Sequence, residues 1–519
     1  MNTRSSTQRA PLARTAPPPL LPTGQLPEVA FAKPQAASAA QAIIAVLPVD
    51  AAAKVLTALP DSARWTQLHG RAQPKPGTLR TTTLNDRQQT LAVLGYIAGD
   101  ASAFERLSLA GRLVKETAAR EPQTLALFAP RSPGKDGSSQ DALLAAALAH
   151  SFRLPAFRST PRESRALRRI MLLGAPPGAR LDVNFELAAA RGNNLVRWLT
   201  AMPPNLLDSR NYRQALQQLA RRHRLQMKWF DQASLRRAGA GAFLAVAAGN
   251  AGADAGIAKL SYRPRGHAGS PDIALVGKGI LFDTGGVNLK PHRSMLEMHT
   301  DMSGSAVAVA TLLALAELRA PIAVDAWLAI TENQIGPHAY RPQEIVRAAN
   351  GITIQVVHTD AEGRMVLADT LALASRTRPK FMLDFATLTG AAVNALTERM
   401  SAVLTNRPQL VTALVAAGRT SGERVWPFPL EADYDAELES KVADVLQCAV
   451  DGKGDHILAS RFLARFVGEG IPWAHVDLAS ATRSGGLAHI NTDVTGFGVR
   501  FALELVLKHD ILGAARRCT

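Results

Sequence analysis

Beyond Pro204 the sequence alternates apolar runs with helical stretches, and this alternation restricts the chain to few folds. The apolar runs typical of buried β-strands are residues 272–279, 322–330, 353–359, 380–387 and 474–479. Between them, residues 305–319 and 365–377 have the composition of helices. Because apolar strands separated by helices favour a parallel sheet with both faces covered, we predict an α/β fold with a mostly parallel or mixed sheet. Ligands of such sheets collect beyond the carboxyl ends of the strands.

The length of 519 residues exceeds what one hydrophobic core usually organises, so we expect more than one domain. Residues 1–40 are rich in Pro, Ala, Ser and Thr and predict a disordered tail. Residues 41–178 predict a smaller amino-terminal α/β domain. Residues 179–204 contain a long predicted helix that would join this domain to a larger carboxyl-terminal domain at 205–519.

The tail has an alternative interpretation. Arg4, Arg9 and Arg14 precede the first acidic residue, Glu28, which is typical of a mitochondrial transit peptide. The proline content of this segment opposes the amphipathic helix that import requires. A disordered tail therefore remains the main prediction.

The composition favours a soluble protein without a membrane span. Apolar residues make up 47% of the chain, yet no apolar run reaches the roughly 18 residues needed to cross a bilayer. The cysteines, Cys448 and Cys518, lie far apart and form no cluster with metal-ligand spacing. We therefore expect a reducing, cytoplasmic location.

The net charge of +16 and the pI near 10.3 raise the alternative of nucleic-acid binding. The basic residues are mostly scattered arginines, with the densest clusters at 162–169 and 210–224. Aromatic residues are only 5% of the chain, which argues against stacking platforms for single strands. A generally basic composition is the main interpretation, and DNA is kept as the alternative partner.

Charged side chains gather after the first predicted strand. Lys278, Asp283, Lys290 and Asp301 lie in and around a glycine-rich loop that leaves residues 272–279. The segment 359–364, TDAEGR, follows another predicted strand. In an extended loop its alternating Asp360, Glu362 and Arg364 would all point the same way.

Four acids gathered at strand ends repel one another, and burying them unpaired costs several kcal/mol. Bound dications are the simplest way to hold them together. Carboxylate oxygens suit Zn, Mn or Mg, and two ions bridged by shared carboxylates form a hydrolytic arrangement. A buried lysine beside dications loses its proton and can donate a lone pair.

A structural alternative exists for each motif taken singly. A lone lysine at a strand edge usually faces solvent. The segment 359–364 is also compatible with the start of a helix that Asp360 caps. The motifs favour a metal site because they occur together, in order, after strands.

The sequence resembles the leucine aminopeptidase family, the cytosol aminopeptidases, from about residue 193 to 504. The fragments that carry this resemblance are TAMPPNLL (200–207), VGKGILFDTGG (276–286), LKP (289–291), TDMSGSAV (300–307), EN followed by AYRP (332–342), TDAEGRMVLAD (359–369) and DFATLTGA (384–391). The resemblance implies a metallo-aminopeptidase that releases amino-terminal residues from peptides. It also implies that 205–519 is the catalytic domain.

By the same resemblance, two divalent ions, Zn²⁺ or Mn²⁺, would be bound in each subunit. Asp283 and Glu362 would bridge both ions. Lys278 and Asp301 would complete the tight site, and Asp360 would complete the exchangeable one.

The remaining roles implied by the resemblance concern catalysis and substrate. Lys290 would polarise the scissile carbonyl, and Arg364 would hold a bicarbonate ion as general base for the bridging water. The pocket for the first side chain would be formed by Met298, Thr387, Leu388 and Gly390, and its apolar lining would favour Leu-like residues.

The family also implies a homohexamer. Some bacterial members bind DNA as architectural or regulatory factors. The alternative function is therefore a DNA-binding hexamer whose peptidase activity is incidental.

Overall fold

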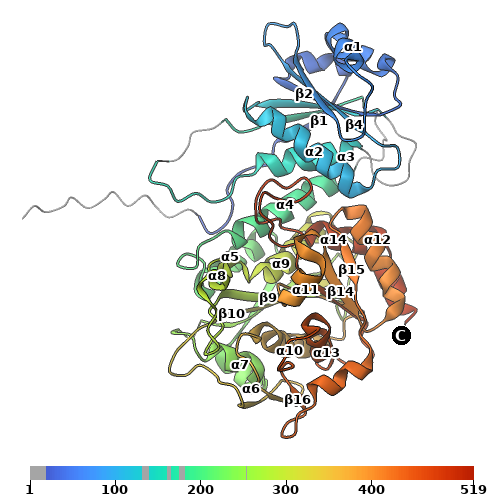
Figure 1. Ribbon diagram of the computed structural model, residues 1–519. Helices are drawn as coiled ribbons and strands as arrows, with labels where there is room; N and C mark the ends of the chain where they lie inside the picture. Colours follow the sequence, from blue (N-terminus) through green and yellow to red (C-terminus); the bar gives the residue numbers. More distant parts are fainter. Residues whose placement is uncertain (1–18, 131–138, 161–164, 175–181, 253, 519) are drawn as a thin grey trace, which may run out of the picture.

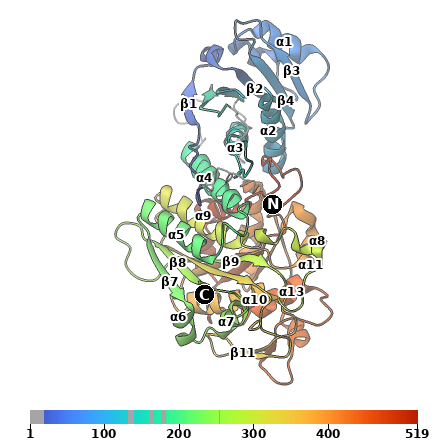
Figure 2. The same cartoon turned by 90° about the vertical axis from the view of Figure 1, so that its left-hand side faces the viewer.

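The computed structural model describes residues 19–130, 139–160, 165–174, 182–252 and 254–518. Two sheet-containing parts lie one above the other, with helix α4 (Val183–Thr200) running between them (Figure 1). The same arrangement is visible in the orthogonal view (Figure 2). The predicted α/β fold class is confirmed, including a smaller amino-terminal part and a larger carboxyl-terminal part.

Among the described residues, the amino-terminal sheet has the strand order β1-β6-β5-β2-β4-β3. All neighbours pair in parallel except β3 and β4. Its strands are β1 (Glu28–Ala32), β2 (Ala42–Pro48), β3 (Leu79–Thr83), β4 (Leu91–Ile97), β5 (Thr124–Phe128) and β6 (Arg169–Leu173). One face packs on α2 (Ala103–Ala118) and α3 (Ser139–Ser151). The other packs on η1 (Pro34–Ala39), η2 (Ala53–Ala58) and α1 (Ser62–Gly70).

The structure differs from the expected tail at its carboxyl end. Residues 1–18 lie outside the described residues, but β1 pairs in parallel with β6 and η1 follows it directly. Val29 of β1 packs against the core of the amino-terminal sheet. The pairing partner of β1 is about 140 residues away, from Glu28 to Arg169, so local composition contains no sign of it.

The carboxyl-terminal sheet has the strand order β15-β14-β17-β13-β9-β10-β8-β7. Its central strands β17, β13, β9 and β10 are parallel, and antiparallel pairings flank them on both sides. The strands are β7 (Gln226–Asp231), β8 (Gly256–Tyr262), β9 (Ile273–Asp283), β10 (Val324–Asn333), β13 (Phe381–Ala386), β14 (Ser401–Thr405), β15 (Val425–Pro427) and β17 (Trp473–Asp477). The sheet is thus mixed around a parallel centre, as the apolar runs predicted.

Helices cover both faces of this sheet. One face packs against α4 together with α5 (Ser209–Arg222), α9 (Ser303–Glu317), α12 (Val411–Ser421), α14 (Val499–Lys508) and α15 (Ile511–Arg516). The other packs against α6 (Gln232–Arg237), α7 (Gly241–Ala247), α10 (Glu362–Ser375) and α13 (Asp455–Ala464). Shorter helices lie in the connections: α8 (His292–Met295), η3 (Met298–Thr300), α11 (Gly390–Leu396), η4 (Thr397–Arg399), η5 (Pro408–Leu410) and η6 (Ala432–Leu438).

One predicted strand was wrong in its extent and its sheet. Residues 353–359 were expected to contribute to the main sheet, but only β12 (Thr353–Gln355) forms. It pairs with β11 (Ile345–Arg347) and β16 (Val445–Leu446) in a separate small sheet. Residues 356–359 instead approach the carboxyl end of β9, where Thr359 bonds to the loop after that strand.

Within the part of the chain that the structure describes, no helix combines the length and apolar character needed to cross a membrane. Both cysteines are free thiols.

Candidate metal centre

The site lies where strand β9 ends, and glycines allow other segments to approach it. A Cβ on Gly277 of β9 would lie 2.5 Å from the Cα of Ser305, so α9 packs directly on this strand. After the strand, Gly285 and Gly286 have φ values of +85° and +64°, which L side chains rarely adopt. A Cβ on Gly285 would lie 3.0 Å from an oxygen of Asp360. The glycines thus let α9 and the segment that contains Asp360 approach β9 and the loop that follows it.

Three carboxylates from these segments converge. Asp283 ends β9, Asp301 lies two residues before the start of α9, and Glu362 begins α10. Each offers an oxygen that lies within 4.8 Å of the other two, and all three residues are buried. The segments that the sequence placed 18 and more residues apart therefore meet in one small volume.

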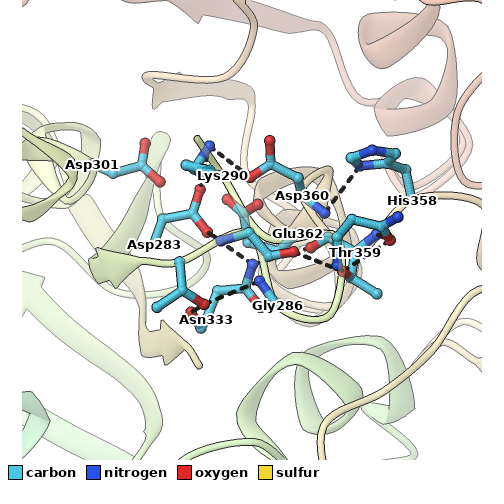
Figure 3. A network of polar contacts seen from close by, with 12 residues as sticks. Asp283, Gly286, Lys290, Asp301, Asn333, His358, Thr359, Asp360 and Glu362 are labelled. Atoms are coloured by element: carbon cyan, nitrogen blue, oxygen red, sulfur yellow. Dashed lines mark hydrogen bonds and ion pairs between the residues drawn. The ribbon is translucent and has the colours of Figure 1, made fainter. Parts of the chain in front are cut away.

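Two lysines bind this cluster together. The Lys278 amine lies 2.8 Å from Asp301 and 2.9 Å from Glu362. The Lys290 amine lies 2.9 Å from Asp283 and 2.6 Å from Asp360 (Figure 3). Lys290 thereby connects Asp360 to the other acids. In total four carboxylates face two lysines, an excess of negative charge that a cation would balance.

Burial has a strong effect on these acids. It raises the pKa of the Asp301 carboxyl to about 6, with Lys278 opposing the rise and Asp283 adding to it. Burial and then repulsion by Asp283 raise the pKa of Glu362 to about 8. The pKa of Asp360 is raised by the same two causes. Perturbed acids gathered in one place are typical of a functional site.

For the two lysines, burial and the neighbouring acids shift the pKa in opposite directions. Burial alone would lower the pKa of the Lys278 amine, but attraction to Asp301, Glu362 and Asp283 outweighs burial and raises it. For Lys290 burial is likewise outweighed, chiefly by Asp283 and Glu362, and its pKa is raised. Among the protein's own groups both lysines therefore hold their protons. The neutral amine expected of Lys278 requires dications that first neutralise these acids.

The donor set fits a divalent cation. Besides the clustered carboxylates, the Oε2 atom of Glu362 is buried and has no hydrogen-bond partner within the described part of the chain. A buried carboxylate oxygen left unpaired is costly, and coordination of a cation removes that cost. Oxygen ligands with one amine suit Zn²⁺ or Mn²⁺.

Neighbouring groups hold the carboxylates in place. The side-chain amide of Asn333, at the end of β10, donates to Asp283 at 2.8 Å and to the Thr359 carbonyl at 3.0 Å (Figure 3). The Tyr340 hydroxyl donates to the same carbonyl at 2.8 Å. The sequence analysis assigned these two residues no role, although both lie in fragments that carry the family resemblance. The ring of His358 accepts a hydrogen bond from the backbone N–H of Asp360. This histidine therefore has a hydrogen-bonding role and does not belong to the cluster of carboxylates.

The residues expected to line the substrate pocket fall into two groups. Thr387 and Leu388 follow β13 and contact the site. The Thr387 hydroxyl donates to Asp301 at 2.7 Å, and its carbonyl accepts from Lys278 at 3.0 Å. Met298 begins η3, three residues before Asp301, and Gly390 begins α11 at an exposed position. Met298 and Gly390 are placed near the site only by their position in the backbone, next to residues that contact it.

The expected geometry of residues 359–364 was wrong. An extended loop would have aimed Asp360, Glu362 and Arg364 to one side, but α10 begins at Glu362, after Ala361 as its N-cap. Asp360 does not cap the helix through its side chain. Residues two apart on a helix point about 200° apart, so Glu362 and Arg364 face different ways.

Arg364 accordingly contacts a different group from the clustered acids. Its guanidinium is 2% exposed and donates to both carboxylate oxygens of Asp455, at 2.8 and 2.7 Å. A second nitrogen donates to the Gln447 carbonyl at 3.3 Å. Asp455 begins α13, and no motif in the sequence pointed to it.

Comparison with known proteins places the chain among peptidases. Residues 194–503 match the model of the cytosol aminopeptidase family, catalytic domain. A probable cytosol aminopeptidase of Parasynechococcus marenigrum (strain WH8102) is 36% identical over 84% of this chain and 90% of that protein. One of Syntrophotalea carbinolica is 37% identical over 79% of this chain and 83% of that protein.

The chain is also similar to solved structures over most of its length. The bottromycin maturation enzyme BotP in complex with Mn has a TM-score of 0.78 and 32% identity, and the match covers 90% of this chain and 99% of that one. A second BotP structure has a TM-score of 0.77 and 31% identity, with 92% and 100% covered.

Proposed function

This chain belongs to the cytosol aminopeptidase family, and on that premise we propose that it cleaves amino-terminal residues, preferably Leu-like ones, with two divalent ions. The observation that carries the proposal is the meeting of Asp283, Asp301 and Glu362 oxygens within 4.8 Å. The family is one of metal-dependent hydrolases, so the use of a metal follows from membership. The number of ions, their ligands and the substrate preference are the proposal.

The two ions would be held by side chains with separate duties. Asp283 and Glu362 would be shared between the two ions, and each offers an oxygen within 4.8 Å of the other. Lys278 and Asp301 would complete one position, and they contact each other at 2.8 Å. Asp360 completes the other, on the more open side of the cluster, where its side chain is 27% exposed. That exposure is consistent with an exchangeable ion.

When bound, the ions supply Lewis acidity that polarises a peptide carbonyl and lowers the pKa of a water molecule. The chain's own side chains neutralise charge on the substrate and orient the carboxylates. Lys290 keeps its proton because the acids around it raise its pKa, so it presents a positive charge to the oxygen of the scissile carbonyl. Thr387 fixes the orientation of Asp301, and Asn333 fixes that of Asp283.

The first side chain of the substrate would bind among Met298, Thr387, Leu388 and Gly390. Leu388 supplies apolar surface, and its backbone N–H is held by Asp477 at 2.9 Å. The exposed Gly390 leaves room, since a Cβ there would meet nothing within 4 Å. Such a lining favours apolar residues with modest selectivity, about 1–3 kcal/mol per methylene.

Zn²⁺ and Mn²⁺ are both proposed, because the donor set suits either and the similar BotP structure contains Mn. The homohexamer, the cytoplasmic location and the DNA-binding alternative remain predictions from the sequence and the family resemblance. A gel-shift titration at low salt tests the last of these, since binding by counterion release weakens steeply as salt rises.

The test of the proposal is hydrolysis of leucine p-nitroanilide and of leucine peptides by protein loaded with Zn²⁺ or Mn²⁺. We expect Glu362→Ala and Lys290→Ala to lose this activity. Metal analysis of the active protein should find two ions per subunit. Equal activity in those two variants, or an active protein without metal, would refute the proposal.

A further inference from the structure

The ion pair between Arg364 and Asp455 joins the candidate metal centre to helix α13. Both carboxylate oxygens of Asp455 accept from one guanidinium nitrogen, at 2.8 and 2.7 Å. Arg364 is buried, whereas the Asp455 side chain is 25% exposed. The carboxylate is therefore held by a buried cation while part of its surface remains open to solvent.

The pair is tied to the backbone that carries the proposed metal ligands. Arg364 also donates to the carbonyl of Gln447. The side-chain oxygen of Gln447 in turn accepts from the backbone N–H groups of Val357 and His358, both at 3.0 Å, and its amide donates to the carbonyl of Ala361. Asp455 is thus positioned by the same short segment that presents Asp360 and Glu362.

Four acids of the site already have a proposed role. Asp283, Asp301, Asp360 and Glu362 are proposed as metal ligands, and a coordinated carboxylate is a poor proton acceptor. Hydrolysis by water nevertheless requires a group that takes a proton from the attacking water. Asp455 is an acid next to this segment that is held in place without being a proposed ligand.

We propose that Asp455 is the general base of the peptidase reaction, an inference that rests on the proposed function. Its carboxylate takes one proton from water as the water oxygen forms a bond to the carbonyl carbon of the first peptide bond. The carbonyl π electrons move to the carbonyl oxygen, beside Lys290. When they return, the C–N bond breaks, and the proton on Asp455 passes to the leaving amine nitrogen. A free amino acid and a shortened peptide result.

This assignment replaces the bicarbonate ion that the family resemblance led us to expect at Arg364. Bicarbonate and an aspartate side chain present the same planar, singly charged pair of oxygens to a guanidinium. The Asp455 carboxylate already accepts from one terminal nitrogen of Arg364, so an anion that binds at that nitrogen has to displace Asp455. The enzyme would therefore carry its own base and need no added bicarbonate.

The experiment compares wild type, Asp455→Ala and Asp455→Asn in carbon-dioxide-free buffer, with and without bicarbonate. Asp455→Ala removes the base and leaves room for an anion. Asp455→Asn removes the base and fills the same space. The matched control is Asp435→Ala. Asp435 is also a partly exposed acid, and it pairs at 2.6 Å with Arg461, which lies in α13 as Asp455 does. Binding of isotope-labelled bicarbonate, followed by NMR line width, is the readout independent of activity.

We expect both Asp455 variants to lose about 10²-fold to 10⁴-fold in kcat, the usual contribution of a general base. Bicarbonate should restore much of the activity of Asp455→Ala and should bind to it, but not to Asp455→Asn or to wild type. Asp435→Ala should behave as wild type does. An Asp455→Asn variant with wild-type kcat, or a wild-type enzyme that depends on bicarbonate, overturns the inference alone. A wild-type protein that hydrolyses no peptide overturns the proposed function and this inference together.

Discussion

A Cβ on Gly363 would lie 2.7 Å from the Nζ atom of Lys278, closer than non-bonded atoms approach. Gly363 belongs to the first turn of α10, and Lys278 lies in β9. The absence of a side chain at this position lets the amine reach both Asp301 and Glu362. The first turn of α10 and the side chain of Lys278 therefore fit together only because residue 363 is glycine.

Gly363→Ala should therefore impair metal binding without unfolding the protein. Alanine favours a helix over glycine by about 1 kcal/mol, which offsets part of any local strain. The displaced amine should weaken metal affinity and lower kcat/KM at least about 10-fold, the lower range for disturbing a group that supports a metal site. Calorimetric metal titration and thermal unfolding measure the two effects. Gly70→Ala is the control, because a Cβ there meets nothing within 4 Å.

Thr387→Val tests whether the hydroxyl holds Asp301 in its coordinating orientation. The substitution removes the 2.7 Å hydrogen bond to Asp301 and leaves the backbone carbonyl free to accept from Lys278. We expect metal affinity to fall about 10-fold to 100-fold, as for other groups that orient ligands. Thr387→Ser retains the hydroxyl and should bind metal as wild type does. Equal affinity in all three proteins would contradict the assignment.

Removal of the metal should destabilise the protein. Ions that bind only the folded state contribute about 2.7 kcal/mol when their free concentration is about 100 times the dissociation constant. Without them the cluster retains its excess of negative charge. Chelation should lower Tm and abolish hydrolysis, and Mn²⁺ or Zn²⁺ should restore both. In Glu362→Gln, which lacks one of the proposed bridging carboxylates, we expect fewer than two ions per subunit and a smaller drop in Tm on chelation.

Glu423 predicts a pH dependence of stability away from the metal centre. Burial raises the pKa of its carboxyl from the ordinary 4.5 to about 7, although the N–H groups of Phe501 and Gly498 oppose the rise. Between these two pH values the folded state binds more protons than the unfolded state, so the free energy of unfolding contributed by this group falls as pH rises. Below pH 4.5 the contribution is fully present, and above pH 7 it has been lost.

Glu423→Gln should remove this dependence. One amide oxygen can accept from both N–H groups, which the carboxylate now binds with a single oxygen at 2.8 Å. The Tm difference, wild type minus variant, should therefore decline between about pH 5 and 7 and level off above that. The exposed Glu437→Gln serves as a control for loss of an acid. A difference that does not change with pH would argue against a raised pKa at Glu423.

Much of the fold could be predicted because its signals are local. The apolar runs that became β9, β10, β13 and β17 identify buried strands wherever they pair. Strand β1 was missed because EVAFA is short, and what makes it a strand is its pairing with β6, far along the chain. For the same reason residues 356–359 were mistaken for strand. Val357 and His358 donate to the side chain of Gln447, and Thr359 bonds to the loop after β9.

By itself, the sequence determined which chemical groups this protein can bring to a metal: the acids, the two lysines and the glycines that leave room for them. Tertiary structure alone decided how those groups are paired. Helix α10 begins at Glu362, so Glu362 turns towards Lys278 while Arg364 turns towards Asp455, 91 residues further on. The sequence gives the type of side chain at each position directly. Its partner depends on the phase of a helix and on the folding together of distant segments, which no local pattern records.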